Sequence, residues 1–554
     1  MLGQLPGIGP SISAHLDEYL RTGKSKHFLK VFKGISRSVF KIMRVPTLGP
    51  KKAYKLAKAL KLINEKTAVA DLKKKCLNGE VAKIEGFGQK SEQEIISAIN
   101  QYESQTEKKE RMILPYASEL ASQIINYLKK NPLVDQVDAL GSLRRMVATV
   151  GDIDIAVKVK SEKLKVKSYE KIIDYFINYP RVVKVNNAGE KKASIVVRPD
   201  IQVDLRVQES NNYGSMLQYF TGSKSHNVKL REYALRKGYS LSEYGIKKIK
   251  DQISKIKTKD QKTKLKIFSD EKEFYNFLGL QYIPPEIREG TEEITLASKN
   301  QIPKLVELTS IKGDLHIHSS YDVRPSHDLG KDSVVEIVKT AKKMSYEYVG
   351  FADHNPSIST NSENKIISII KQRRYYIDKL FYNKKIERSD YFIGLEVDIK
   401  TNGQLALPDK ALDHLDYIIV GVHSAFNMEQ DEMTKRILTA LDYPKVRILA
   451  HPTGRLLMKR DGYELDWKKI FDRCKKNKIA LEINAFPDRL DLPDVLVKEA
   501  IESDVKLIIN TDAHQISQMK NIIYGVATAR RGWAKKIDII NSLNYNKIKQ
   551  WLID

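Results

Sequence analysis

The stretch "GSLRRMVATVGDIDIAV", residues 141–157, decides the fold that we expect for the first half of the chain. Its last part, "GDIDIAV", alternates aspartates with apolar β-branched residues, which is typical of a β-strand. Successive side chains of a strand point to opposite faces, so Asp152 and Asp154 share one face. Two carboxylates so close together repel each other, and we therefore expect a cation between them.

A third carboxylate, Asp204, lies in a second predicted strand, "IQVDLRV" at residues 201–207. Three carboxylates converging from neighbouring strands suit Mg²⁺, which also takes substrate phosphates as ligands. Two such ions can activate an attacking hydroxyl and stabilise the leaving oxygen in phosphoryl transfer. The alternative is a solvated strand face. The upstream turn favours catalysis, because Ser142 and a guanidinium from Arg144 or Arg145 can hold a triphosphate.

Three similar segments recur near the N-terminus: "LPGIGPSISAHL" from Leu5, "VPTLGPKKAYKL" from Val45 and "IEGFGQKSEQEI" from Ile84. In each, an apolar residue leads into a glycine turn, and a helical pattern follows. The free N–H groups of such a turn and of the next helix favour a phosphate. The three segments resemble helix-hairpin-helix motifs, which bind the DNA backbone without reading its sequence. The alternative is that they are plain corners between two helices. The glycines expected at the backbone are Gly7, Gly9, Gly49, Gly86 and Gly88.

Eight of the eleven histidines lie between His316 and His514. Seven apolar runs in this half end in polar residues, and helical patterns lie between most of them. This alternation predicts an α/β barrel whose site gathers at the C-terminal ends of its strands. The ligand-type side chains at or just after those ends are His316, His318, His354, Glu396, His423, His451, Asp512 and His514. Imidazoles with carboxylates suit Zn²⁺, Mn²⁺ or Fe²⁺, and so many donors predict two or three ions.

The composition fits a multidomain protein that binds nucleic acid. The chain has 554 residues and a net charge of +26, which favours a polyanionic partner, although a lysine-rich background would give the same charge. Cys76 and Cys474 are the only cysteines, so we expect no disulfide framework and a cytoplasmic location. No apolar run is long enough to span a membrane, and the N-terminus lacks a signal peptide's apolar region.

Both halves resemble known families. The Gly-Ser turn, the paired aspartates and the third aspartate resemble the polymerase-β type of nucleotidyltransferase. The segment "YFTGSKSHNVKLREYALRKGYSLSEYGI", residues 219–246, resembles the nucleotide-selecting segment of family X DNA polymerases. The histidine-rich half resembles the PHP domain, a distorted seven-stranded barrel with a trinuclear metal site. With "LGLQYIPPEIREG" between them, nearly the whole chain resembles prokaryotic family X DNA polymerases with a C-terminal PHP domain.

The resemblance assigns roles to individual residues. It makes Asp152, Asp154 and Asp204 the catalytic residues, which bind Mg²⁺ or Mn²⁺. The nucleotide-binding residues that it implies are Gly141, Ser142, Arg145, Gly151, Tyr219, Phe220, Gly222, Asn227 and Arg231. A further barrel ligand is expected soon after His318, where this chain has the longer "SSYDVRPSHDLGK". We prefer His327 there, with Asp322 and Asp328 as rivals, and we interpret His414 as structural.

The implied fold is multidomain. It has a helix-hairpin-helix domain with an abbreviated N-terminus, an α/β nucleotidyltransferase palm, a thumb-type nucleotide-selecting subdomain, a linker and a distorted (β/α)7 PHP barrel. Their expected ranges are 1–110, 111–212, 213–290, 291–311 and 312–554. The implied function is gap-filling DNA polymerase with 3′–5′ exonuclease or 3′-end phosphoesterase activity in base-excision repair. The expected substrates are dNTPs and gapped or nicked DNA, bound by a monomer.

The chain departs from the family at two positions. His15 stands where the animal enzyme has a lysine that forms a Schiff base with an abasic sugar, so we expect no lyase activity there. Lys224 replaces an acidic residue. Three alternatives remain open: a template-independent nucleotidyltransferase with a PHP phosphatase, a barrel that acts on small phosphate monoesters, and a DNA-binding scaffold with silent sites.

Overall fold

The computed structural model describes residues 14–15, 18, 25, 27, 30, 32–33, 35–45, 48–65, 67–106, 111–160, 166–249, 265–387 and 391–553. Gly7 and Gly9 lie outside the described residues. The chain divides into two compact units, Met1–Glu110 and Arg111–Asp554.

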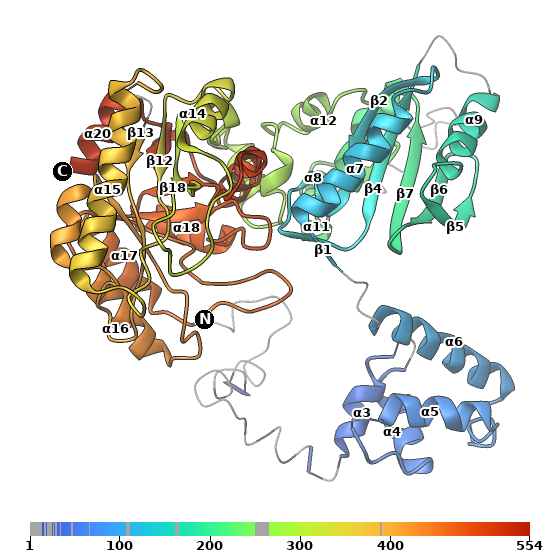
Figure 1. Ribbon diagram of the computed structural model, residues 1–554. Helices are drawn as coiled ribbons and strands as arrows, with labels where there is room; N and C mark the ends of the chain where they lie inside the picture. The colour runs from blue at the N-terminus through green and yellow to red at the C-terminus, as the bar shows by residue number, and fades with distance from the viewer. Residues whose placement is uncertain are drawn as a thin grey trace. The chain divides into compact units, whose positions relative to one another are not determined.

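The first unit is helical (Figure 1). Its longer described helices are α3 (Arg37–Ile42), α4 (Pro50–Ala59), α5 (Ala68–Leu77) and α6 (Gln89–Thr106). Their apolar faces form one core that includes Ile42, Leu56 and Ile99. Glycine turns precede two of the helices, as expected: Gly49 caps α4, and Gly88 comes directly before α6.

The segment predicted to be the palm, which is called the palm below, begins the second unit and is built on a five-stranded sheet in the order β2-β4-β7-β6-β5. Its elements are β1 (Met112–Ile113), α7 (Leu114–Leu128), β2 (Val134–Ala139), α8 (Gly141–Arg144), β3 (Thr149–Val150), β4 (Ile153–Val159), α9 (Val166–Ile177), β5 (Val182–Ala188), β6 (Lys192–Val197) and β7 (Ile201–Gln208). Helices α7 and α9 pack against the sheet. Strands β4 and β7 are parallel, and residues alternate along them between fully and partly buried positions.

A smaller α/β segment follows the palm. It contains α10 (Tyr213–Thr221), α11 (Lys224–Arg236), β8 (Tyr239–Ser242), β9 (Gly245–Lys248), β10 (Leu265–Lys266) and α12 (Glu271–Phe277). The segment that the sequence suggests as a polar linker, 291–311, is not extended throughout. It forms α13 (Glu293–Ser298), and Ile294 and Ala297 join the same core as Leu230 and Phe274. Ile294 and Ala297 are three positions apart, so they lie on the same side of the helix, and this side is buried.

The C-terminal half has eight parallel strands in two sheets, β11-β12-β13 and β14-β15-β16-β17-β18. Strands β13 (Tyr391–Ile393) and β14 (Glu396–Asp398) belong to different sheets but are separated by only two residues; counted as one strand, they would give the expected seven among the described residues. The others are β11 (Gly313–Ile317), β12 (Tyr348–Phe351), β15 (Ile418–Gly421), β16 (Val446–Leu449), β17 (Ala480–Asn484) and β18 (Leu507–Asn510). A parallel bridge between Ile317 and Ala513 joins the ends of the first and last strands. This closure is consistent with the expected barrel.

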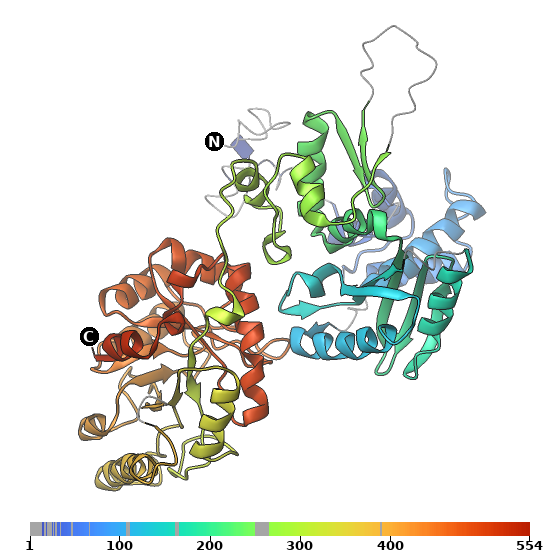
Figure 2. The same ribbon diagram turned by 90° about the horizontal axis from the view of Figure 1, so that it is seen from above.

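Helices lie outside these strands (Figures 1 and 2). They are α14 (Val334–Lys343), α15 (Glu363–Tyr382), α16 (Gln430–Ala440), α17 (Trp467–Lys476), α18 (Asp494–Glu502), α19 (Ile522–Arg531) and α20 (Tyr545–Ile553). The strands are almost completely buried and largely apolar, as parallel strands covered by helices require, but β11 and β17 also bury polar residues such as His316 and Glu482.

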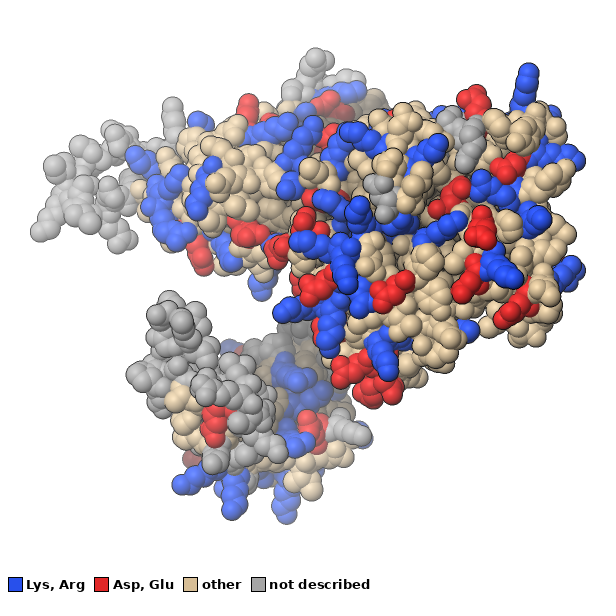
Figure 3. Space-filling view, turned by 90° about the vertical axis from the view of Figure 1, so that its left-hand side faces the viewer, with Lys and Arg blue, Asp and Glu red and all other residues tan. Residues whose placement is uncertain are grey.

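The excess positive charge is spread over the surface rather than concentrated in one patch on the face in Figure 3, where lysines and arginines alternate with acidic residues. Over the described part of the chain, no helix is both long and apolar enough to cross a membrane.

Candidate functional site

The paired strands β4 and β7 bring the three aspartates of the palm together. Asp154 on β4 lies directly opposite Asp204 on β7 in the parallel register. Asp152 comes just before β4, two positions from Asp154, and all three residues are partly exposed. Gln202 donates from Nε2 to both carboxylate oxygens of Asp204, at 3.1 and 3.0 Å, and so fixes its orientation. The strand register thus places Asp154 opposite Asp204, but within the described residues the three aspartates do not form one of the groups whose donor atoms lie within 4.8 Å of one another.

The Gly-Ser turn lies against the same carboxylates. Gly141 begins α8 with φ +58°, a conformation that glycine adopts without strain. A Cβ atom at this position would lie only 2.6 Å from Oδ2 of Asp154. Any side chain here would therefore collide with the carboxylate, which explains why glycine stands next to Ser142. Gly151, the other glycine of this stretch, lies near the guanidinium of Arg111.

The two arginines of this turn have different partners. Arg144 pairs with Glu271 of α12, which also pairs with the fully buried Arg288. Burial raises the pKa of Glu271, but the two guanidinium groups outweigh it and lower this pKa to about 2. Arg145 donates from Nε to Glu289 at 3.2 Å and from Nη1 to the carbonyl oxygen of Thr221. Arg144 thus pairs with a buried carboxylate, whereas Arg145 pairs with a carboxylate that is 34% exposed.

The predicted nucleotide-selecting residues surround the end of α10. Asn227 donates from Nδ2 to the carbonyl oxygen of Tyr219 at 2.7 Å. Arg231 lies 5.8 Å from the ring centroid of Tyr219. Gly222 comes directly after the last residue of α10 and has φ +67°. A Cβ atom at this position would lie 3.2 Å from Nη1 of Arg145. The turn and this segment are therefore neighbours in the structure.

Arg206 of β7 was missed by sequence reasoning. Its guanidinium lies 3.7 Å from the ring centroid of Phe220. Because it follows Asp204 by two positions on a strand, it shares the face of the aspartate. That periodicity could have identified it as a cation beside the nucleotide-selecting segment.

The histidine-rich half gathers every predicted ligand in one place. The candidate ligands form four overlapping groups, and within each group the donor atoms lie within 4.8 Å of one another. These groups are His318, His354 and His514; His316, His318, Glu396 and Asp512; His327, Asp398 and His423; and His354, Glu396 and His423. His451 joins them through Nε2, which lies 3.0 Å from Oε1 of Glu396. Glu396 is thus shared by several parts of the cluster.

Two observations make this cluster fit metal ions. First, buried side-chain atoms that make no hydrogen bond within the described structure gather here: Nε2 of His316, Nδ1 of His318, Nδ1 of His354, Oε2 of Glu396, Nδ1 of His451 and Nε2 of His514. Buried polar atoms usually have partners, so such a concentration calls for an explanation. Second, burial lowers the pKa of His316, but the carboxylates of Glu482, Glu396 and Asp512 outweigh it and raise that pKa well above its ordinary value. Cations would satisfy both features.

The segment after His318 offers three candidate ligands in different surroundings. His327 points Nε2 at Oδ1 of Asp398, 3.0 Å away. The Asp328 carboxylate lies 3.5 Å from Nε2 of His354 and 3.4 Å from Nε2 of His514. Asp322 accepts a hydrogen bond from the backbone N–H of Arg324, which is a local turn contact. His327 and Asp328 therefore both border the cluster.

Two further carboxylates were missed. Asp398 accepts from Nδ1 of His423 at 2.7 Å, and Glu482 accepts from Nδ1 of His316 at 2.7 Å. In each case the other ring nitrogen faces Glu396, at 3.2 Å. Carboxylates that hold the second nitrogen of a ligating histidine fix its tautomer and orientation. Asp398 is two positions from Glu396 on β14 and Glu482 lies on the buried strand β17, but neither position shows that a histidine ring packs against it.

A cavity of about 540 Å³ opens over the cluster. Besides the metal-ligand candidates it is lined by Lys331, Arg460 and Arg489 and by the rings of Phe426 and Phe486. Cations and aromatic rings around a metal cluster are suited to a phosphoester that carries a flat group.

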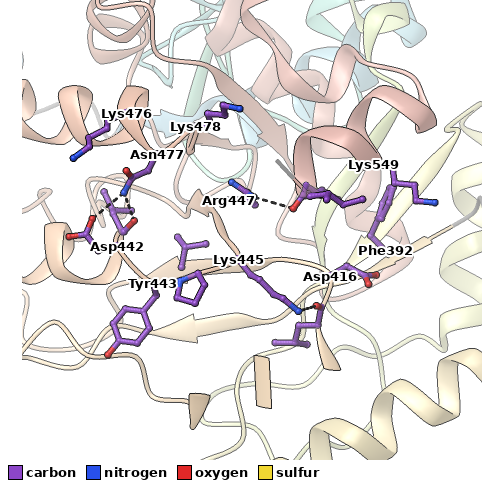
Figure 4. A pocket seen from close by; sticks show the side chains of 16 residues that line it. Phe392, Asp416, Asp442, Tyr443, Lys445, Arg447, Lys476, Asn477, Lys478 and Lys549 are labelled. Carbon is purple, nitrogen blue, oxygen red and sulfur yellow. Dashed lines mark hydrogen bonds between the residues drawn. The ribbon is translucent and has the colours of Figure 1, made fainter. Parts of the chain in front are cut away.

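A larger hollow, about 800 Å³, lies at the other ends of the strands (Figure 4). Its lining includes Asp416 before β15, Lys445 before β16 and Lys478 before β17. Lys445 donates to the carbonyl oxygens of Leu412 and Leu415, so it serves the framework. In α/β barrels, chemistry lies at the C-terminal strand ends, and we assign this hollow no catalytic role.

Comparisons with known proteins find matches to both halves of the chain. The family model described as DNA polymerase beta thumb matches residues 216–289, and the PHP domain model matches residues 314–486. The DNA polymerase/3′-5′ exonuclease PolX of Bacillus subtilis (strain 168) is 33% identical over 550 residues, 99% of this chain and 90% of that protein. A probable phosphatase of Clostridium acetobutylicum is 24% identical over 214 residues, 36% of this chain and 78% of that protein. The probable phosphatase YcdX of Escherichia coli O81 (strain ED1a) is 24% identical over 174 residues, 31% of this chain and 63% of that protein.

A polymerase-β thumb joined to a PHP domain defines a class of two-site proteins with an α/β fold in several domains. Within that class, this chain belongs to the bacterial family X DNA polymerases of the PolX type with a C-terminal PHP domain. The resemblance that the sequence motifs indicated is therefore confirmed.

Proposed function

We propose that the protein is a template-directed, gap-filling DNA polymerase with a 3′–5′ exonuclease or 3′-end phosphoesterase in its barrel, acting in base-excision repair. The observation that carries the first activity is the register of β4 and β7, in which Asp154 faces Asp204 beside the Gly141 turn. Family membership supports both activities. The expected substrates are dNTPs and the 3′ ends of gapped or nicked DNA.

In the palm, Asp152, Asp154 and Asp204 would hold Mg²⁺ or Mn²⁺. Bound ions supply activation of an attacking hydroxyl and stabilisation of the leaving oxygen. Ser142 and Arg145 would hold the triphosphate, because a guanidinium matches phosphate oxygens in pairs. The carbonyl oxygen of Tyr219, fixed by Asn227, would face the sugar and discriminate against a 2′-hydroxyl.

In the first unit, the turns ending at Gly49 and Gly88 and the turn at Gly86 would contact the DNA backbone. Gly86 has φ +82°, and the Nζ atom of Lys55 lies 3.6 Å from where its Cβ would be. A cation beside an exposed turn is suited to a phosphate. His15 stacks on His27 with 4.2 Å between ring centroids, and an imidazole cannot form an imine with a sugar. We therefore expect no lyase activity there.

In the barrel, the ligands would be His316, His318, His354, Glu396, His423, His451, Asp512 and His514, shared among two or three ions. Bound Zn²⁺, Mn²⁺ or Fe²⁺ supplies Lewis acidity and lowers the pKa of water for attack on phosphorus. Of the two residues that border the cluster, His327 shares a candidate metal-binding group with Asp398 and His423, whereas Asp328 is 74% exposed and belongs to none of the four groups. This grouping favours His327 as the additional ligand, with Asp328 as its rival.

One substrate tests both activities. A gapped duplex with a labelled primer and a 5′-phosphate would be incubated with Mg²⁺ or Mn²⁺, with and without dNTPs. We expect template-dependent filling of the gap when dNTPs are present and shortening from the 3′ end when they are absent. Extension that ignores the template would instead support the template-independent nucleotidyltransferase. Hydrolysis of a free phosphate monoester, with DNA ends left intact, would support a small-molecule phosphatase.

A further inference from the structure

The last turn of helix α19, in the C-terminal half of the chain, contacts the palm at the loop that is predicted to bind the triphosphate. Arg531, the final residue of α19, has a side chain that is only 9% exposed. Its Nη1 donates to the carbonyl oxygen of Arg145 at 2.9 Å and to Oε1 of Glu289 at 2.9 Å. One guanidinium of the barrel half therefore contacts the main chain of the nucleotide-binding turn directly.

The carboxylate of Glu289 is shared between two cations. The same Oε1 atom that accepts from Arg531 also accepts from Nε of Arg145, at 3.2 Å. Arg145 in turn donates from Nη1 to the carbonyl oxygen of Thr221, in the nucleotide-selecting segment. Arg531 thus fixes the backbone of Arg145 and competes for the carboxylate that holds its side chain.

Arg531 is itself held firmly from the barrel side. Its Nε donates to Oδ2 of Asp494 at 2.7 Å, and Nη2 lies 2.6 Å from the same oxygen. It also stands at the C-terminal end of a helix, where the helix dipole favours a cation. Asp494 therefore already holds the guanidinium in place, so its contacts with the palm cost little additional side-chain entropy.

The surrounding contact is apolar and continuous. Leu490 and Tyr524 of the barrel half belong to the same buried cluster as Leu143 of α8 and Val150 of β3. A second arginine, Arg530, pairs with Glu286 at 2.7 Å and donates to the carbonyl oxygen of Val306. Within the described residues Arg530 makes no hydrogen bond with the turn itself, so it offers a matched comparison for Arg531.

From these contacts we propose that Arg531 is a positioning residue for nucleotide binding, supplied to the polymerase site by the PHP half. It acts through Arg145: it anchors the carbonyl oxygen of that residue and takes part of the charge of Glu289. Without Arg531, the turn would lose its anchor, and Glu289 would pair with Arg145 alone and draw its guanidinium away from a phosphate. This inference rests on the proposed function, in which Arg145 binds the triphosphate.

The test is single-nucleotide insertion into a gapped duplex by the full chain, with KM for the dNTP and kcat measured separately. For Arg531→Ala we expect KM to rise on the order of tenfold, with kcat changed much less. Arg531→Lys should lie between, because an ammonium cannot reproduce the fork that spans Asp494, Glu289 and a carbonyl oxygen. Arg530→Ala should keep the KM of the parent protein. Trimming of a single strand from its 3′ end should be unchanged in all three.

Several outcomes would overturn the inference. An unchanged KM in Arg531→Ala would do so, as would an equal rise in Arg530→Ala, which would mean that the whole contact matters only for folding. If Arg531→Ala loses trimming or unfolds at a lower temperature, KM for the dNTP is measured for Glu289→Gln instead. This variant removes the charge that Arg145 and Arg531 share and retains the shape of the side chain. An unchanged KM in that variant would refute the proposal. Failure of the parent protein to insert any nucleotide would instead count against the proposed function.

Discussion

The two candidate sites are built in opposite ways. The palm places three partly exposed carboxylates on one sheet surface, next to a glycine turn. The barrel buries most of its candidate ligands, among them His316, Glu396 and Asp512, and many of the cluster's donor atoms make no hydrogen bond in the described structure. An oxygen-ligated Mg²⁺ usually takes waters and substrate phosphates as additional ligands, whereas imidazole-rich sites hold transition metals through protein atoms. The substrate would therefore complete the palm site, and the protein alone would complete the barrel site.

The largest effect should come from the palm carboxylates. Replacing Asp152 and Asp154 together with Ala should reduce nucleotide addition by on the order of 10³-fold or more, because several kcal/mol of charge stabilisation is lost. Trimming from the 3′ end should remain, since these residues are not part of the barrel. Primer extension and trimming on the same labelled duplex would measure both. Persistent extension would show that the polymerase site lies elsewhere.

The reciprocal change in the barrel should abolish trimming and leave extension intact. In the double variant His354→Ala and His451→Ala, each substitution removes an imidazole in contact with Glu396. We expect less bound transition metal, measured by mass spectrometry of the purified protein, as well as loss of trimming. His414→Ala, a residue outside the cluster, serves as the control. Full trimming in the double variant would contradict the assignment.

Chelation should separate the two sites by the strength with which they hold metal. After brief treatment with EDTA and removal of the chelator, added Mg²⁺ should restore extension at once, because that ion enters with the substrate. Transition metal should leave the buried barrel site more slowly, so trimming should survive a short treatment. Equal loss and equal recovery of both activities would break the comparison.

A smaller effect should follow from the carboxylate behind His316. Glu482→Gln replaces an acceptor of the Nδ1–H group of His316 and of the backbone N–H group of His451. Loss of such a partner typically weakens metal binding by about 10–100-fold. Competition with a chromophoric chelator would measure it. Glu464→Gln, outside the cluster, is the control, and unchanged affinity would show that Glu482 only fills space.

The contact between the palm and the smaller α/β segment should respond to acid through Glu271, which pairs with Arg144. Its pKa is lowered from an ordinary 4.5 to about 2, despite burial that raises it, by Arg288 and Arg144. A carboxyl whose folded pKa is depressed stabilises the protein above its unfolded pKa, and this contribution disappears as the pH falls from about 4.5 to about 2. Glu271→Gln should lower the unfolding free energy by about 3–5 kcal/mol at neutral pH. Thermal melts from pH 7 to pH 3 should show the difference between variant and parent shrinking.

Sequence periodicity was enough to find the metal-ligand candidates, because strands impose a period of two. It placed Asp152 with Asp154 and His316 with His318. It was not enough to find Asp398 and Glu482, whose role depends on a ring nitrogen that only the packed barrel brings near. The partners of Arg144 and Arg145 also lie far away in the sequence: Glu271 is 127 positions from Arg144, and Glu289 is 144 positions from Arg145. Long-range ion pairs of this kind leave no local pattern in a sequence.

The domain ranges, and the roles of single residues in nucleotide and DNA binding, stay predictions. So does the role of the glycines at the first turn, because Gly7 and Gly9 lie outside the described residues. The break between β13 and β14 had no counterpart in the sequence pattern, since "YFIGLEVDI" is a continuous apolar run. Gly394 explains it in part: a Cβ there would lie 2.3 Å from the Tyr417 ring, so the chain passes too close for a side chain.

The register of β4 against β7 has a consequence for quality control during biosynthesis. A slip of one residue would turn Asp154 into the core and expose Ile153 and Ile155, both now fully buried. Such a chain would be recognisably misfolded and open to degradation. The hydrophobic pattern that stabilises the sheet therefore also excludes the one-residue slips that would separate Asp154 from Asp204.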